Sequence, residues 1–117
     1  MQRICFQLQV RSERLDEYRS RHAEVWPSML EAIAASGRRN YSLFLRADGL
    51  LIGYYETDDD TASQLSLASN PATAPWEAEM AHFFESVDGR PDQQALQLTE
   101  IFNLEQQLAT AKAQEQS

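Results

Sequence analysis

Tyr18 and His22 are the two residues whose types and spacing most clearly suggest chemistry. They lie four positions apart, so on a helix their side chains occupy the same face, one turn apart. The remaining residues of that face are apolar, and they are Leu15, Val25, Trp26 and Met29. The pair is therefore predicted to point inward. Because histidine titrates near neutral pH, an inward His22 is a candidate general acid or base, with Tyr18 beside it.

A structural role fits the same pattern. A buried histidine and tyrosine can also be ordinary core residues whose polar atoms are satisfied by neighbours. Periodicity does not distinguish the two interpretations. Other candidates are weaker alone. Tyr41 starts a strand-like run and could rim a pocket, whereas Trp76 and Glu77 begin a later helix, where tryptophan is usually core and glutamate usually solvated.

Two glutamates are candidates for a second acid–base group. Glu100 lies two residues from both Leu98 and Phe102 in the predicted last strand, so it shares their face of the strand and is expected to point inward. Glu56 has a corresponding ambiguity on the third strand. Either residue could instead be a charge that protects a strand edge. His82 lies off the apolar stripe of its helix and is expected to be exposed.

Several motifs that mark common enzyme classes are absent from the sequence. It contains no GxGxxG, GxxxxGK[ST] or GxSxG pattern, and its two histidines are not in an HExxH pattern. Cys5 is the only cysteine, which excludes an intrachain disulfide and a thiolate-rich zinc site. We predict neither a cofactor nor a metal. A histidine, tyrosines and aromatic rings around an apolar pocket suit a small polyhydroxylated ligand.

Composition narrows the class further. The length of 117 residues predicts a single domain. A net charge of −8 disfavours binding to nucleic acid or to an anionic membrane surface. No apolar run approaches the length of a membrane span, and the N-terminal residues do not resemble a signal peptide. The expected location is the cytoplasm.

The elements that would position these residues follow from the hydrophobic pattern. Residues 3–10 alternate between apolar and polar, which predicts a half-buried strand. A helix should follow, capped by Ser12, kinked or broken at Pro27 and ended by Gly37. Two strands over 40–46 and 50–57 are separated by Asp48-Gly49, a strong hairpin signal.

The second half of the chain is predicted in the same way. A helix opens in the acidic run 58–60, with Asp60 as a possible cap, and is interrupted at Asn70-Pro71. Another helix begins at about Pro75 and carries one apolar face, formed by Trp76, Met80, Phe83 and Val87. A loop over 88–94 and a last strand over 95–104 follow. Residues 105–117 are predicted to be a frayed helix or a disordered tail.

The resulting order, β-α-β-β-α-β, predicts an α+β fold of the ferredoxin-like, split β-α-β type. Its antiparallel sheet would carry helices on one face and leave the other face uncovered. Two such domains often close their open faces together, so by analogy we expect a homodimer in the form of a dimeric α+β barrel. The domain is expected to span residues 1–104, with residues 105–117 as a separate tail.

The sequence also resembles a known family. Residues 17–27, EYRSRHAEVWP, are similar to the L-rhamnose mutarotase signature EY-x-x-RH-x-x-[IV]WP. Asn40-Tyr41 matches the NY of that family at the start of the second strand. Weaker matches follow in the right order, and they are Leu50-Leu51, the helix with Trp76 and Met80, and the run LTEIF at 98–102. The resemblance covers about residues 1–104.

This resemblance implies a dimeric enzyme that interconverts the α and β anomers of L-rhamnose or a related 6-deoxy-hexose, without a cofactor. It implies that His22 is the proton donor and that Tyr18, Tyr41 and Trp76 bind the sugar. Relatives carry a second tryptophan after the one matching Trp76, and here that position is Glu77. Glu77 is therefore included among the expected sugar-binding residues, and its identity leaves the preferred sugar open.

Two other functions remain compatible with the sequence. One is a cofactor-independent monooxygenase or isomerase built on the same dimeric α+β barrel. The other is a non-catalytic dimeric module that binds a ligand. The combined tyrosine, histidine and tryptophan signature favours the mutarotase over both.

Overall fold

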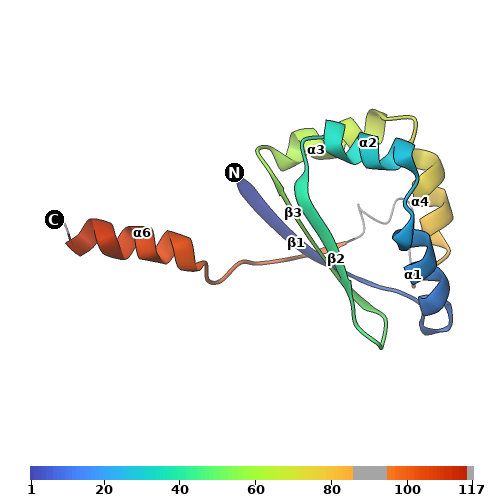
Figure 1. The fold of residues 1–117 in the computed structure, drawn as a ribbon, viewed down its shortest axis with the longest axis horizontal. Helices are drawn as coiled ribbons and strands as arrows, with labels where there is room; N and C mark the ends of the chain where they lie inside the picture. Colours follow the sequence, from blue (N-terminus) through green and yellow to red (C-terminus); the bar gives the residue numbers. More distant parts are fainter. Residues whose placement is uncertain (86–94, 116–117) are drawn as a thin grey trace.

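The strands form one antiparallel sheet in a computed structural model that describes residues 1–85 and 95–115. The sheet has the order β2-β3-β1-β4 and consists of β1 (Gln2–Gln9), β2 (Arg39–Leu45), β3 (Leu50–Thr57) and β4 (Leu96–Leu98). One side of it is covered by α1 (Leu15–Ala23), α2 (Pro27–Ala35), α3 (Asp60–Ser69) and α4 (Thr73–Ala81) (Figure 1). The predicted ferredoxin-like α+β architecture is confirmed.

The central strands alternate as predicted. On β3, Leu51, Gly53 and Tyr55 are buried and face the helices, while the residues between them are partly exposed. Phe6 of β1 lies opposite Gly53 in the register. A side chain at Gly53 would collide with the Phe6 ring, so glycine is required there. These residues form the floor beneath the helices.

The first helical region contains two confirmed predictions and one that is wrong. Ser12 does not cap the helix, since it begins a short 3-10 turn, η1 (Ser12–Arg14), and α1 follows without a side-chain cap. The predicted break at Pro27 is confirmed, because α1 ends at Ala23 and Pro27 occupies the first turn of α2. Proline suits that position, where no backbone N–H is required. Gly37 follows α2 with φ of +91°, a conformation that favours glycine.

The hairpin and the next helix are also close to prediction. Gly49 has φ of +94° in the turn between β2 and β3. Asp59, one position before the predicted residue, caps α3, and its side chain accepts a hydrogen bond from the Ala62 amide at 3.1 Å. Asp60 instead accepts a hydrogen bond from the Tyr55 hydroxyl at 2.5 Å. The interruption at Asn70 is confirmed, because α3 ends before it and α4 begins after it.

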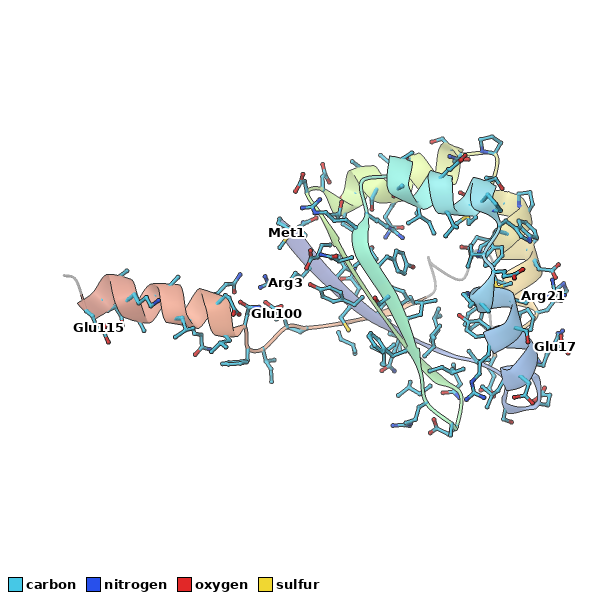
Figure 2. The ribbon with its side chains drawn as sticks, viewed as in Figure 1. Met1, Arg3, Glu17, Arg21, Glu100 and Glu115 are labelled. Atoms are coloured by element: carbon cyan, nitrogen blue, oxygen red, sulfur yellow. The ribbon has the colours of Figure 1, made fainter. Side chains whose placement is uncertain are left out.

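The predicted last strand over 95–104 is wrong in extent. Only the three residues of β4 pair with β1. Glu100 does not face inward, because it is exposed and its carboxylate binds the Arg3 guanidinium through two contacts of 2.8 Å (Figure 2). The tail forms α6 (Leu104–Glu115), which extends away from the sheet and has no buried residue (Figure 1). The predicted loop over 88–94 and Val87 lie outside the described residues.

The two faces of the sheet differ in what covers them. Between the sheet and the helices lies the core, which includes Val10, Met29, Leu51, Leu67, Trp76, Met80, Phe83 and Phe84. The opposite face exposes apolar side chains of the sheet, namely Phe44, Leu96 and Leu98, and the segment after β4 exposes Ile101 and Phe102. In the part of the chain that the structure describes, no helix combines the length and hydropathy needed to cross a bilayer.

Candidate active site

A cavity of about 490 Å³ lies between the sheet and the helices. Its volume is typical of sites for small molecules. The structure brings together all five predicted site residues around this cavity, and they are Tyr18, His22, Tyr41, Trp76 and Glu77. The rest of the lining is mainly apolar, with Arg38, Arg39 and Asn40 as further polar residues.

His22 is held by its own helix and by two rings. Its Nδ1 atom lies 3.0 Å from the Tyr18 carbonyl oxygen, and a carbonyl can only accept, so Nδ1 carries the proton. The His22 ring packs against the Tyr18 ring at a centroid distance of 4.2 Å and meets the edge of Trp76 at 5.6 Å. In the neutral imidazole, Nε2 is therefore the unprotonated nitrogen and can accept a proton.

The surroundings of His22 lower its pKa. Partial burial removes the imidazolium from water and is the larger effect, while the bond from Nδ1 to the Tyr18 carbonyl partly opposes it. The neutral ring is thus favoured at neutral pH. At neutral pH the ring can therefore accept a proton on Nε2.

Tyr18 differs from His22 in that it can donate a proton in a hydrogen bond but cannot accept one. Only 4% of its surface is exposed, and its ring meets Phe83 and Phe84 edge-on. Burial raises the pKa of the Tyr18 hydroxyl far above its usual value, and the nearby Tyr41 and Glu77 raise it further. The phenol therefore stays protonated at neutral pH. It can donate a hydrogen bond to a ligand, but it is not a base.

Trp76 forms a wall of the cavity from α4. It is 6% exposed, and its ring is supported by the Trp26 ring at a centroid distance of 5.0 Å. Trp26, one of the apolar residues assigned above to the inward helix face, is itself 37% exposed and does not lie in the core. It lies just before α2 and packs against Trp76 from outside.

Tyr41 and Glu77 contribute polar groups from opposite layers. Tyr41, on β2, stacks on the Tyr55 ring at 5.2 Å. Glu77, on α4, is half-buried, lines the cavity, and acts on the Tyr18 pKa, so its carboxylate belongs to the site and not to a fully solvated first turn. Among the described residues of the cavity lining, Glu77 is the one carboxylate.

The two glutamates considered as a second acid–base group lie elsewhere. Glu56 accepts hydrogen bonds from the Tyr54 hydroxyl and from the Asn40 side chain, both at 2.7 Å, and these bonds lower its pKa. Glu100 is bound to Arg3. Neither lines the cavity, so this chain does not place either carboxylate at its own site. His82 is exposed, as predicted.

Arg38 is a cavity residue that sequence reasoning missed. It is 6% exposed and lines the cavity at the start of β2. An arginine directly after a helix-ending glycine is ordinarily expected in solvent. No alternation gave a signal, because Arg38 precedes β2 and Arg39 and Asn40 line the same cavity. In the described ranges, no cluster of three or more His, Cys, Asp and Glu residues is arranged to bind a metal ion.

Known proteins share both the sequence pattern and the fold. A family model described as L-rhamnose mutarotase matches residues 3–104. An L-rhamnose mutarotase from Jannaschia sp. is 32% identical over 108 residues, which cover 89% of this chain and 99% of the relative. One from Bacillus subtilis is 33% identical over 98 residues, covering 82% and 91%.

Solved structures show where this fold recurs. An L-rhamnose mutarotase from Formosa agariphila superposes with a TM-score of 0.72 at 23% identity, covering 89% of this chain and 99% of that one. The tetracenomycin F2 cyclase of Streptomyces glaucescens superposes with a TM-score of 0.60 at 17% identity, covering 89% and 99%. The second likeness shows that the fold also supports other chemistry. Because the family model spans almost the whole domain, this chain belongs to the L-rhamnose mutarotase family.

Proposed function

We propose that this protein is an isomerase that interconverts the α and β anomers of L-rhamnose or a related 6-deoxy-hexose. The observation that supports it best is the position of His22, whose Nε2 is available for proton transfer in a cavity walled by Tyr18 and Trp76. Family membership supports the same reaction.

The reaction requires only proton transfers around one breaking bond. Neutral His22 takes the proton of the anomeric hydroxyl on Nε2, and the resulting imidazolium delivers a proton to the ring oxygen as the bond between C1 and that oxygen breaks. Rotation of the open-chain aldehyde and reclosure give the other anomer. A well-placed acid–base residue contributes about 10²–10⁴-fold, which is sufficient for a reaction that also occurs unaided in water.

The other site residues bind and orient the sugar in this proposal. The protonated Tyr18 hydroxyl donates a hydrogen bond, Trp76 offers a ring face or edge to C–H groups, and Tyr41 contributes from the sheet. Glu77 accepts hydrogen bonds from sugar hydroxyls, which the tryptophan of relatives cannot do.

The proposal includes a homodimer that buries the uncovered sheet face. The support is the set of exposed apolar residues on and beside that face, which includes Phe44, Leu98 and Ile101. Stable homodimer interfaces are usually large and apolar. The cytoplasmic location stays a prediction from composition.

Saturation-transfer NMR on equilibrated L-rhamnose, L-fucose and related sugars tests the activity directly. Irradiating one anomeric proton should reduce the signal of the other faster in the presence of the protein than in buffer alone. Exchange at the uncatalysed rate with every sugar would refute the mutarotase. Binding without exchange would favour the non-catalytic module.

A further inference from the structure

The Arg38 guanidinium is buried beside the cavity with part of its hydrogen-bonding capacity unused. Only 3% of the side chain is exposed. Its Nε donates to the Ser63 hydroxyl at 3.0 Å, and its charged group lies 4.1 Å above the centre of the Tyr55 ring. These contacts hold the side chain in place in the cavity lining.

The two terminal nitrogens of Arg38 lack acceptors. Asp60 is the nearest carboxylate, but its Oδ1 lies 3.8 Å from Nη2, beyond hydrogen-bonding distance. Within residues 1–85 and 95–115, neither Nη1 nor Nη2 has a hydrogen-bond acceptor. Among the described side chains only Thr73 Oγ1 is both fully buried and without a partner, so Nη1 and Nη2 keep some open surface from which they can donate. A ligand in the cavity would supply the missing acceptors.

The charges around Arg38 indicate what kind of acceptor fits. Asp60 already balances the guanidinium at close range, and the neighbouring Arg39 is paired with Asp58 at 2.9 Å. The site therefore has no uncompensated positive charge that would favour a carboxylate or phosphate. Neutral oxygen acceptors, such as the hydroxyls of a sugar, satisfy the N–H groups without adding charge.

Arg38 and His22 lie at opposite ends of α2. His22 precedes the helix and Arg38 follows it, and the nine residues of α2 extend about 13 Å at the usual rise per residue. Both side chains line the same cavity. A pyranose that has its C1 and ring oxygen at His22 and its ring lying along α2 would present its opposite edge, which carries the C3 and C4 hydroxyls, toward Arg38.

We propose that Arg38 binds the C3–C4 edge of the sugar, with Nη1 and Nη2 donating hydrogen bonds to the two neighbouring hydroxyls. This inference rests on the proposed mutarotase function and adds a residue that determines specificity. Arg38 selects aldoses with two adjacent hydroxyls at C3 and C4, while His22 acts on C1 and the ring oxygen. Arg38 does not touch the reacting atoms, so its contribution appears mainly in KM.

The test combines a variant with deoxy-sugars. Arg38→Met keeps a long side chain but removes every donor, and Arg46→Met, at the exposed hairpin outside the cavity lining, is the matched control. NMR titrations measure the binding of L-rhamnose and of its 2-deoxy, 3-deoxy and 4-deoxy derivatives. In the parent and in Arg46→Met, loss of the 3- or 4-hydroxyl should weaken binding about 10-fold or more.

The variant should bind L-rhamnose more weakly than the parent binds either the 3-deoxy or the 4-deoxy sugar, because it lacks both donors, and it should lose nothing further with those sugars. Loss of the 2-hydroxyl should affect all three proteins equally. If Arg38→Met discriminates the 3- and 4-deoxy sugars as the parent does, the inference is overturned. Absence of anomer exchange, together with this Arg38-dependent binding, would refute the mutarotase proposal alone.

A second measurement needs no folded variant. With ¹⁵N-labelled arginine, the guanidinium signals of Arg38 in the parent should shift on addition of L-rhamnose, because its N–H groups gain acceptors. The 3,4-dideoxy sugar, added to the same site occupancy, should leave the Nη signals unshifted. Unchanged Nη signals with saturating L-rhamnose would overturn the inference even if Arg38→Met does not fold.

Discussion

Replacing His22 with alanine tests the mechanism most directly. The change removes the only described imidazole of the cavity, together with its contacts to the Tyr18 and Trp76 rings. Each aromatic contact is worth about 0.5–1.5 kcal/mol, so folding should be weakened but retained. The loss of acid–base catalysis should be much larger, about 10²–10⁴-fold in rate, or roughly 2.7–5.4 kcal/mol of the activation barrier.

The assay compares anomer exchange by saturation-transfer NMR in the parent, His22→Ala and His82→Ala. His82 is an exposed histidine outside the cavity lining, so its variant should exchange anomers at the parent rate. Circular dichroism and sugar binding should first show that His22→Ala is folded and still binds L-rhamnose. If that folded variant exchanged anomers as fast as the parent, His22 would be a structural residue and the proton-transfer mechanism would be wrong.

Three further predictions concern pH, sugar preference and assembly. Burial lowers the pKa of His22. Its contribution to the free energy of unfolding is therefore fully present above the unfolded pKa of about 6.5 and is lost as pH falls through the lower, folded pKa. Acid titrations of the parent and of His22→Gln should differ in this window, and identical curves would contradict the prediction. Glu77→Trp should shift relative exchange rates toward 6-deoxy sugars over their 6-hydroxy counterparts, because a ring face replaces a hydrogen-bond acceptor; an unchanged sugar panel would place Glu77 outside binding. Phe44→Glu on the exposed sheet face should convert a dimer into monomers in sedimentation experiments, and a parent that is already monomeric at micromolar concentration would refute the dimer.

Local sequence signals account for most of the fold. The alternation in β1, the Asp48-Gly49 turn and the breaks at Pro27 and Asn70 act over a few residues, so each could be recognised without knowing the rest of the chain. The pairing of Tyr18 with His22 is equally local, because two residues four apart on a helix must be neighbours.

Predictions failed where two local choices were nearly equal. Asp59 and Asp60 are both good capping residues, and the core decides between them, because Asp60 is engaged by Tyr55 from β3. Glu100 would share the inward face of Leu98 and Phe102 if the strand continued. The strand ends at Leu98, however, and the carboxylate binds Arg3. Arg3 lies 97 residues from Glu100, and Tyr55, although only five residues from Asp60, meets it from a neighbouring strand in the fold, so no periodic pattern could reveal either contact.

The sequence by itself determined the order of elements, the inward helix face with Tyr18 and His22, and the family signature, because these depend on spacing along the chain. Only the tertiary structure decided that Trp26 packs against Trp76, and that Arg38 is buried in the lining of the cavity. The physical reason is that burial and hydrogen-bond partners depend on elements that meet only in the folded chain. An arginine has the same local preferences in solvent and in a pocket, and its surroundings alone distinguish the two.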